Sequence, residues 1–341
     1  MATSLKDIAA RLNISVSTVS YALNDGPRQV SPETKQRVLD VARDLKYRPN
    51  RMAQAMITGR SHTIGIVLPE LVTNALLSPY LHIALNAVAN EAGRLGQDIL
   101  IFTQHKDHGE IDFVNSLHDG RVDGLIFFAP STVDAIEHVL DSGLPCTVIS
   151  ACPEVDVPCF KADNFQGVEL AMRHLYELGH RKIAHLAGRL DMPDAIDRLR
   201  GYQQFLRDHR IAYRDEWVVQ GRFLIEHGRE AMKTLMALPE RPTAVFCAND
   251  EMAIGAVLAC NELSIRVPDE ISVVGFDCIP TSMVIAPAIT SVRQPVDALS
   301  TAAVQALVAL IEDREPETNL SFVTELIVRS STSNPKVESL L

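Results

Sequence analysis

The stretch LKDIAARLNISVSTVSYALND, residues 5–25, decides the architecture of the first part of the chain. Ser4 stands directly before it and Asp7 lies three positions later, as in a partial capping box, which predicts a helix start at this point. Apolar residues then recur at helical spacing, at Leu5, Ile8, Ala9 and Leu12. The segment therefore predicts an amphipathic helix that ends near Asn13.

Two more helices follow within the first fifty residues. Ser15 is a good N-cap for a second helix that reaches Asn24, with an inward stripe formed by Val19 and Leu23. The sequence SPE at residues 31–33 has the order of an N-cap followed by proline in the first turn, and it predicts a third helix ending before Tyr47. The inward residues of this third helix are expected to be Val38, Val41, Ala42 and Leu45.

Two short helices joined by a tight turn, with a third in support, are typical of a helix-turn-helix, whose second helix lies in the major groove of DNA. A small three-helix scaffold without a ligand is the alternative. Charge favours DNA binding, because residues 1–61 carry +5 whereas the remainder of the 341-residue chain carries −16. Such asymmetry indicates a polyanion-binding module joined to a different domain.

The first fifty-six residues resemble the lactose/galactose repressor family of bacterial regulators. The resemblance rests on residues 5–25, on VSPETKQRVLDVARDLKYRPN at 30–50 and on NRMAQAM at 50–56. It implies a DNA-binding headpiece over residues 1–48. It also implies that the DNA contacts come from the second helix and the segment after the headpiece, with base reading by Val16, Ser17 and Tyr21, phosphate contacts from Thr18, Ser20 and Asn24, and further contacts from Ser15 and Asn50.

Tyr21 departs from the family pattern, in which arginine is common at this place. An arginine fork can bind guanine O6 and N7 together, whereas tyrosine offers one hydroxyl and an apolar ring. The operator sequences of other members therefore do not transfer to this chain. A packing role for Tyr21 between helices is the alternative.

Residues 49–61 are expected to form a hinge helix and linker. The segment from Asn50 to Thr58 is too short for an isolated helix in water, so it should fold only with help. The resemblance implies that two such helices from a dimer pair in the minor groove and insert an apolar wedge between base steps. Met56 occupies the wedge position, where leucine is common; an ordinary linker is the alternative.

From residue 62 onward, apolar runs alternate with amphipathic segments. The runs TIGIVLP, QDILIFT, DGLIFFA, PCTVIS, KIAHLAG, AVFCAND and ISVVGFD are typical of parallel strands covered on both faces. Helices are expected between them at Pro79–Leu95, Gln166–Leu178, Arg198–His209 and Val296–Glu312. The fold class is thus an all-α helix-turn-helix headpiece plus an α/β sensor of two doubly wound lobes, with ligands at the carboxyl ends of the strands.

Residues 62–341 also resemble the type I periplasmic sugar-binding fold that the repressor family uses as its sensor. The landmarks are HLYELGHRKIAHLAG at 174–188, RLRGY at 198–202, AVFCANDEMAIGAV at 244–257 and VPDEISVVGFD at 267–277. The resemblance implies three crossings between lobes, near residues 162, 291 and 323. Lobe 1 then spans about 62–161 and 292–322, and lobe 2 spans about 162–291 and 323–333.

The resemblance also implies a set of effector-binding residues in the cleft. Arg198 matches the family's cleft arginine, whose planar fork suits a diol or carboxylate, unless it is a surface residue. Asn249 and Asp277 end strands and can reach hydroxyl groups, with turn capping as the alternative. Phe223 is expected to stack on the ligand or to lie in the core. Ser150 stands where several members carry an acid, and the loop 70–77 lacks the aromatics common there, so the identity of the sugar stays open.

Other classes of function lack support in the sequence. The chain has no GxGxxG, GxxxxGK[ST], GxSxG or HExxH motif, so we expect no enzyme activity, no catalytic residues and no cofactor. The six cysteines form no CxxC pairs, which favours reduced, buried thiols and no metal site. No apolar stretch is long enough for a membrane helix and no secretory signal is present, so we expect a cytoplasmic protein.

The sequence therefore predicts a transcription regulator, most simply a repressor, that binds pseudo-palindromic operator DNA as a homodimer. A small-molecule effector, a sugar or sugar derivative, is expected to control it, as inducer or corepressor. The C-terminal tail carries no leucine heptads that would form a tetramer. The rivals are a solute-binding protein of a transporter and an enzyme.

Overall fold

A computed structural model describes residues 3–24, 30–48, 55, 59–68, 78–102, 115–117, 119–130, 133–150 and 155–336. The chain divides into two compact units, Met1–His62 and Thr63–Leu341. The expected DNA contacts Asn50 and Met56 and the loop 70–77 lie outside the described residues, as does the side chain of Asn24.

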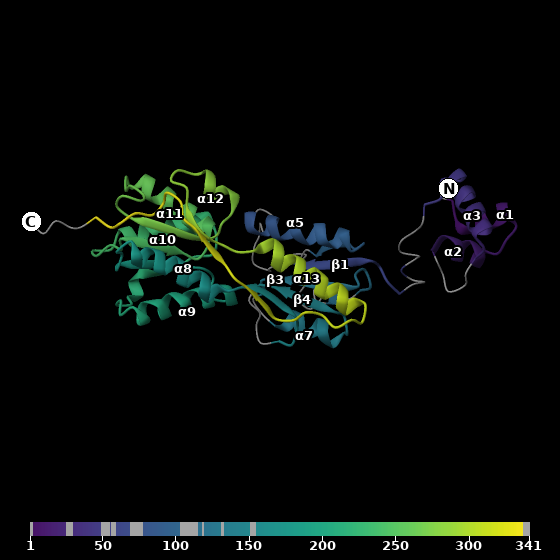
Figure 1. The fold of residues 1–341 in the computed structure, drawn as a ribbon, viewed down its shortest axis with the longest axis horizontal. Coiled ribbons are helices and arrows are strands. Elements are labelled where there is room, and N and C mark those ends of the chain that lie inside the picture. Colours follow the sequence, from purple (N-terminus) through teal and green to yellow (C-terminus); the bar gives the residue numbers. More distant parts are fainter. Residues whose placement is uncertain are drawn as a thin grey trace, which may run out of the picture. The chain divides into compact units, whose positions relative to one another are not determined.

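The first unit contains the three expected helices, α1 (Leu5–Leu12), α2 (Val16–Asn24) and α3 (Pro32–Asp44) (Figure 1). Their starts follow the local capping chemistry that the sequence predicts. Asp7 accepts hydrogen bonds from both the backbone N–H and the hydroxyl of Ser4, each at 2.8 Å. The hydroxyl oxygen of Ser31 likewise accepts from the backbone N–H of Thr34 at 3.3 Å.

A small apolar core holds the three helices together. Its buried members come from all three helices: Ile8, Ala9, Val19, Ala22, Val38 and Ala42. The other residues expected to face inward, among them Leu23 and Val41, are half-buried and pack against this cluster. Because these residues fill the inner face, the polar face of α2 is left at the surface.

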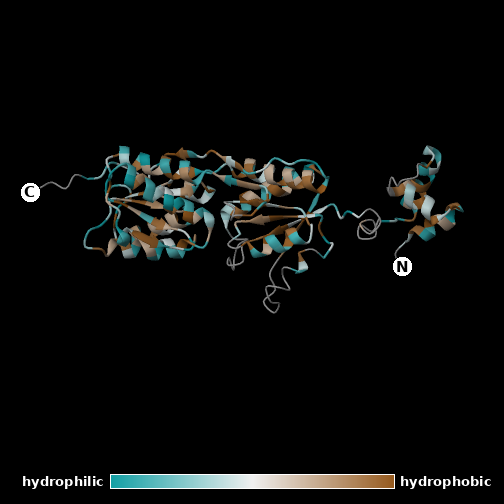
Figure 2. Ribbon diagram, turned by 90° about the horizontal axis from the view of Figure 1, so that it is seen from below, coloured by the Kyte–Doolittle hydropathy of each residue, from teal (hydrophilic) through white to brown (hydrophobic). Residues whose placement is uncertain are grey.

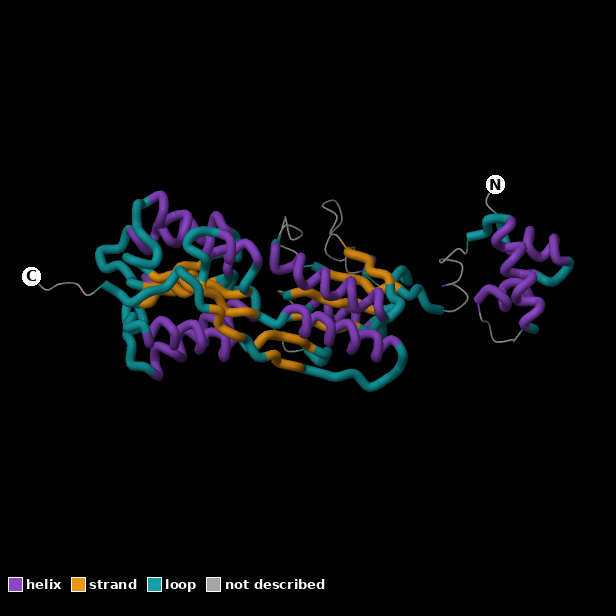
Figure 3. The backbone as a smooth tube through the Cα atoms, turned by 45° about the horizontal axis from the view of Figure 1, so that its top comes forward, coloured by secondary structure: helices purple, strands orange, loops and turns teal. Residues whose placement is uncertain are grey.

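The second unit contains two six-stranded sheets, each covered by helices on both faces (Figures 1 and 3). The first sheet has the strand order β11-β5-β4-β3-β1-β2, and its neighbouring strands all pair in parallel. We call this sheet and its helices lobe 1. The strands are β1 (Thr63–Val67), β2 (Asp98–Phe102), β3 (Gly124–Phe128), β4 (Cys146–Ile149), β5 (Cys159–Ala162) and β11 (Leu320–Phe322), and the helices are α5 (Pro79–Arg94), α7 (Asp134–Asp141) and α13 (Val296–Ile311).

The second sheet, with the order β12-β10-β9-β8-β6-β7, forms lobe 2. Its pairs are parallel except for the antiparallel pair of β10 and β12. The strands are β6 (Ile183–Ala187), β7 (Val218–Gln220), β8 (Ala244–Cys247), β9 (Ser272–Asp277), β10 (Thr290–Arg293) and β12 (Glu325–Ile327). The helices are α8 (Asn164–Glu177), α9 (Pro193–Asp208), α10 (Ile225–Met236), α11 (Asp250–Glu262) and α12 (Pro280–Val284), with a short 3-10 turn, η2 (Asp215–Trp217).

The apolar strands are sandwiched between amphipathic helices in both lobes, as Figure 2 shows in the brown colour of the strands. Buried clusters lie on both faces of each sheet. In lobe 1, α5 and α13 cover one face; in lobe 2, α10 and α11 cover one face and α8 and α9 the other. This arrangement leaves the carboxyl ends of the parallel strands as the edges where polar side chains can gather.

The chain passes between the sheets three times. It leaves lobe 1 after β5, returns between β10 and α13, and passes back between β11 and β12. The second passage follows Arg293, two residues beyond the expected position, because β10 continues to pair with β9 up to that residue.

Several elements differ from the expectation. Strands β5, β7, β10, β11 and β12 were not predicted, since each has only three or four residues and most carry polar side chains. Helix α9 begins at Pro193, five residues before the expected start at Arg198. Proline in the first turn is a start signal in its own right, and the extra turn brings Asp194 into the helix.

The cysteines follow the prediction in part. Cys146, Cys247 and Cys260 are buried free thiols, and Cys278 is a half-buried one. Cys159 is disulfide-bonded, so the expectation of reduced thiols is wrong at this residue. Two thiols bond when their Cβ atoms come within about 4 Å, a condition that the tertiary structure sets and motif spacing does not reveal.

Candidate effector pocket and DNA-binding surface

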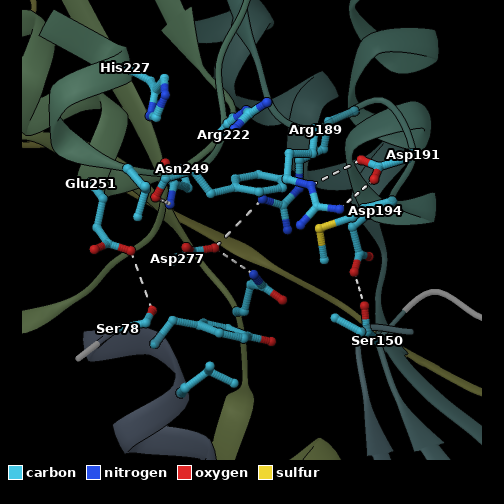
Figure 4. Close-up of a pocket in the computed structure, with 18 of the residues that line it drawn as sticks. Ser78, Ser150, Arg189, Asp191, Asp194, Arg222, His227, Asn249, Glu251 and Asp277 are labelled. Carbon is cyan, nitrogen blue, oxygen red and sulfur yellow. Dashed lines mark hydrogen bonds and ion pairs between the residues drawn. The ribbon is translucent and has the colours of Figure 1, made fainter. Parts of the chain in front are cut away.

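A cavity of about 500 Å³ lies between the two lobes (Figure 4). Lobe 1 lines it with Ser78, Tyr80, Leu81, Ala129 and Ser150, and most of the remaining lining belongs to lobe 2. Many of these residues stand at the carboxyl ends of parallel strands, where doubly wound sheets bind ligands. All five residues expected to contact an effector, Ser150, Arg198, Phe223, Asn249 and Asp277, line this one cavity.

Arg198 is a buried arginine, only 4% exposed, and not the surface residue that was the alternative. Its Nε donates to Asn164 Oδ1 at 2.8 Å and its Nη1 donates to the backbone oxygen of Ala248 at 2.5 Å. The guanidinium carbon also lies 3.9 Å from the ring centroid of Phe276. These contacts fix the plane of the guanidinium, which allows it to present a rigid fork to a ligand.

Asp277 faces Arg198, with 3.7 Å between Oδ1 and Nη1. Gln294 Nε2 donates to the same carboxyl oxygen at 2.6 Å. Burial raises the pKa of Asp277 to about 8, although Arg198 opposes the shift. A carboxyl group in this state can both donate and accept hydrogen bonds near neutral pH, which suits the recognition of hydroxyl groups.

Asn249 serves first as a helix cap, which was the alternative to ligand binding. Its Oδ1 accepts from the backbone N–H of Met252 at 3.0 Å at the start of α11. Its Nδ2 donates to the backbone oxygen of Phe223 at 3.1 Å, so it also fixes the neighbouring segment of the cavity wall. The side chain therefore ties two walls of the cavity together.

Phe223 is half-buried, with a backbone φ of 62°. Its ring rests directly on Gly188, because a Cβ atom at that glycine would lie 2.2 Å from the ring. The glycine after β6 is thus required for the close approach of the ring. Phe223 forms an apolar wall of the cavity and not part of a buried core cluster among the described residues.

Hydrogen bonds join the lobes across the cavity. Ser150 in lobe 1 donates to Asp194 Oδ2 in lobe 2, and Asn164 Nδ2 donates to Asp194 Oδ1 at 2.6 Å. Ser78 in lobe 1 donates to Glu251 Oε2 in lobe 2 at 3.3 Å. Burial raises the pKa of Glu251 to about 7. These bonds hold the two lobes together around the cavity.

Several residues that line the cavity are not predicted from the sequence: Ser78, Tyr80, Arg189, Asp191, Asp194, Arg222, His227, Glu251 and Gln294. Arg189 lies two residues after β6 and Glu251 lies four residues after β8, so inspecting the residues that follow every predicted strand would have found them. Gln294 follows β10, a strand that was not predicted. Tyr80 and His227 lie in the first turns of α5 and α10, and nothing in their local sequence marks them.

The second helix of the headpiece presents the residues expected to read bases. Val16 is 40% exposed and Ser17 is also exposed, whereas Val19 is buried. Tyr21 is half-buried and, among the described residues, does not belong to the set packed on the headpiece core. A residue that packs between helices would belong to that set. The Tyr21 side chain is instead partly accessible at the surface of α2.

Two of the other expected DNA contacts have local roles. The backbone N–H of Thr18 donates to Ser15 Oγ at 3.0 Å, and the two hydroxyl groups lie 2.8 Å apart. Ser15 therefore caps α2, as the sequence predicts. Ser20 lies half-buried on the same helix.

The comparisons with known proteins agree in both parts of the chain. Residues 4–50 match the model of bacterial regulatory proteins of the lacI family, and residues 172–332 match a periplasmic binding protein-like domain. The probable HTH-type transcriptional repressor ExuR of Bacillus subtilis is 34% identical over 335 residues, which cover 96% of this chain and 97% of the relative. This chain belongs to the lacI family of bacterial regulatory proteins. It is a DNA-binding transcription regulator, and the predicted fold and class of function are confirmed.

Further members of the lacI family match over nearly the whole chain. The HTH-type transcriptional repressor PurR of Mannheimia succiniciproducens is 34% identical over 97% of this chain and 98% of its own length. A structure of the Lac repressor dimer bound to operator and the anti-inducer ONPF matches with a TM-score of 0.85 and 27% identity, covering 98% of this chain and all of that one. A complex of the regulator CelR with cellobiose matches with a TM-score of 0.74 and 29% identity, covering 96% and 99% of the two chains.

Within the described ranges, no helix is long and apolar enough to cross a membrane. Over the same residues, no group of three or more His, Cys, Asp or Glu side chains is arranged to hold a metal ion.

Proposed function

We propose that this chain is a repressor that binds a pseudo-palindromic operator as a homodimer and responds to a sugar or sugar derivative in the cavity between its lobes. The observation that carries the proposal is this cavity, which polar side chains from both lobes line in a chain with a helix-turn-helix headpiece. A ligand that contacts both lobes stabilises one of their relative arrangements, which is what an effector must do.

The DNA-binding role falls to residues 1–48, followed by a hinge at 49–61 and the sensor at 62–341. In this proposal Val16, Ser17 and Tyr21 contact base edges. Phosphates and the remaining DNA surface are contacted by Ser15, Thr18, Ser20, Asn24 and Asn50, with Met56 as the minor-groove wedge. The exposure of Val16 and Ser17 on α2 supports the base-reading role. A Lac repressor structure that contains a dimer and operator supports the assembly.

The effector-binding role falls to Ser150, Arg198, Phe223, Asn249 and Asp277. Arg198 and Asp277 supply rigid polar groups for ring hydroxyls, and Phe223 supplies the apolar wall. The CelR structure in complex with cellobiose and the Lac repressor structure with ONPG support a carbohydrate effector. Closure of the lobes would then change how two protomers meet and order or loosen the hinge helices.

We also propose that the chain works in the cytoplasm and catalyses no reaction. Its relatives are transcription repressors, and this likeness supports both parts of the proposal. Turnover assays on any ligand that binds would reveal an enzyme.

The experiment is genome-wide recovery of DNA bound to the full-length protein, repeated with a Val16→Ala, Ser17→Ala double variant. We expect a palindromic motif with the wild type and its loss with the variant, because both exposed side chains lie on the recognition helix. Failure to enrich a palindromic motif contradicts the proposal. Genes beside the recovered sites would point to the pathway, and gel shifts with and without its sugars would show whether the effector is an inducer or a corepressor.

A further inference from the structure

One side of the cavity is lined by cationic and nitrogen-bearing side chains. Arg222, His227 and Arg189 lie along this side in Figure 4, whereas the carboxyl groups of Asp277 and Glu251 lie nearer the opposite side. We call Arg222, His227 and Arg189 the basic wall. Its chemistry differs from the hydroxyl-binding groups around Arg198, so it calls for a separate explanation.

Arg222 is the exposed cation of the basic wall, and no carboxylate among the described residues pairs with it. Among the described residues its guanidinium makes no ion pair or hydrogen bond. Asp191, a carboxylate that it influences electrostatically, is already paired with Arg189. Arg189 binds Asp191 with both Nε and Nη2, the first at 3.1 Å to Oδ1. Arg222 adds to the lowering of the Asp191 pKa without contacting it. The basic wall therefore keeps one positive charge in excess.

His227 supplies a buried polar atom without a partner. Its Nδ1 is shielded from solvent and makes no hydrogen bond to any described residue. A buried ring nitrogen in this condition is unfavourable unless a ligand or water completes it. Because His227 lines the cavity, a bound molecule is positioned to provide the missing partner.

The start of α10 adds backbone donors beside His227. Leu224 is the N-cap residue and offers no side-chain oxygen, so no side chain caps this helix. Leu224 and His227 both line the cavity, while the acidic residue of the same turn, Glu226, is exposed and does not line it. The N–H groups of a first helical turn, together with the helix dipole, favour an anion.

The acids elsewhere in the cavity weaken this preference little. Burial raises the pKa of Glu251 to about 7 and that of Asp277 to about 8, so both carry little or partial negative charge at neutral pH. Asp194 accepts from Ser150 and Asn164 on the far side of the cavity. At the basic wall itself, Asp191 is paired with Arg189, so the charge left to face a ligand there is that of Arg222.

We propose that the effector is an acidic sugar, whose carboxylate or phosphate group is held by Arg222, His227 Nδ1 and the first turn of α10. The inference rests on the proposed function and names the effector's chemical class. An arginine fork, a ring nitrogen and helix N–H groups together match the several acceptor oxygens of such a group. A cavity of about 500 Å³ has room for the sugar ring as well.

The test is isothermal titration of the full-length protein with matched sugars. The probes are D-glucose with D-glucuronate and glucose 6-phosphate, and D-galactose with D-galacturonate and galactose 6-phosphate. We expect at least one acidic member to bind ten or more times as tightly as its neutral parent, with an affinity that falls as salt is added. Comparison of the affinities for the uronates and for the 6-phosphates shows whether the site prefers a carboxylate or a phosphate group.

Variants assign the preference to the basic wall. Arg222→Gln should lower the affinity for the acidic sugar by at least tenfold and leave that for the neutral parent within threefold. Arg229→Gln is the matched control, because Arg229 lies on α10, pairs with Glu262 at 2.5 Å and does not line the cavity. His227→Leu should also weaken the acid, whereas His227→Asn, which keeps a donor near Nδ1, should weaken it less.

Three outcomes would overturn the inference. They are equal or weaker binding of every acidic sugar compared with its neutral parent, no binding of any acidic probe up to 10 mM, and equal effects of Arg222→Gln and Arg229→Gln. DNA recovery separates these failures from failure of the proposed function. A protein that enriches a palindromic operator but shows no acid preference remains a repressor with a neutral effector.

Discussion

The hydroxyl of Ser78 donates a hydrogen bond of 3.3 Å to Glu251 Oε2 and thereby joins lobe 1 to lobe 2 across the cavity. Ser78 is the N-cap residue of α5, and Glu251 lies in the first turn of α11. On the other side of the cavity in Figure 4, Ser150 makes an equivalent bond to Asp194. The two bonds link the ends of elements that are far apart in the sequence, so they report directly on how the lobes are closed.

Loss of the Ser78 hydroxyl should loosen this closure. Ser78→Ala removes a donor to a largely buried carboxyl group, and we expect the free energy of unfolding to fall by about 1 kcal/mol. Urea denaturation of the full chain measures the change. Ser321→Ala is the control, because Ser321 is exposed on β11. Equal stability of the two variants would show that the bond contributes nothing.

Glu251 should make stability depend on pH. Burial raises its pKa from 4.5 to about 7, so the folded state holds the proton more tightly than the unfolded state. Its stabilising contribution is therefore complete below about pH 4.5 and is lost as the pH rises through 7. We expect the stability difference between the wild type and Glu251→Gln to change over this interval in denaturation series. Parallel curves for the two proteins from pH 5 to 8 would contradict the assignment.

Effector binding should require the guanidinium group of Arg198 and not only its positive charge. Arg198→Lys keeps the charge but loses the fork that binds Asn164 and the backbone of Ala248. We expect effector affinity to fall at least tenfold, while operator affinity without effector stays within threefold, as measured by titration and gel shift. Stability should also drop by about 1–3 kcal/mol, because buried acceptors lose their donors. An unchanged effector response would remove Arg198 from the binding site.

Substitutions at Tyr21 and Val19 of the headpiece should affect DNA binding and folding separately. Tyr21→Ala is expected to weaken operator binding about tenfold with little change in the melting of the headpiece, because the ring lies outside the core cluster. Val19→Ala should do the reverse and destabilise the headpiece by about 1–3 kcal/mol, since Val19 is fully buried. Gel shifts and thermal melts of both variants measure the two effects. Loss of stability in Tyr21→Ala would support a packing role.

Met56 is expected to act as the minor-groove wedge. Met56→Gly should leave the fold of the sensor unchanged and sharply weaken operator affinity, because unstacked base steps lose the apolar side chain inserted between them. Gel shifts with the recovered operator measure affinity, and circular dichroism serves as the folding control. The wedge role fails if affinity stays at the wild-type value. Since glycine also lowers helix propensity, Met56→Ala separates the loss of the wedge from the loss of the helix.

The sequence by itself determined the local elements of this protein. Ser4, Ser15 and Ser31 carry the capping chemistry that starts the three headpiece helices, and each interaction connects residues three apart. The central strands were equally clear, because parallel strands covered on both faces must be continuously apolar. Arg198 and Asp277 could be assigned to the cleft because a strand end or a family motif marks each of them. These features depend on neighbours along the chain, so the sequence contains the information.

Only the tertiary structure decided which side chains line the cavity together and which protonation state their carboxyl groups have there. Ser78 and Glu251 are 173 residues apart, and no periodicity in the sequence relates them. The short strands β7 and β10 were not predicted. The positions just after their ends, which bring Arg222 and Gln294 to the cavity, were therefore not predicted either. Burial sets the raised pKa values of Glu251 and Asp277, and burial is a property of the assembled lobes. The pairing of distant residues and the exclusion of water exist only once both lobes have folded and enclose the cavity between them.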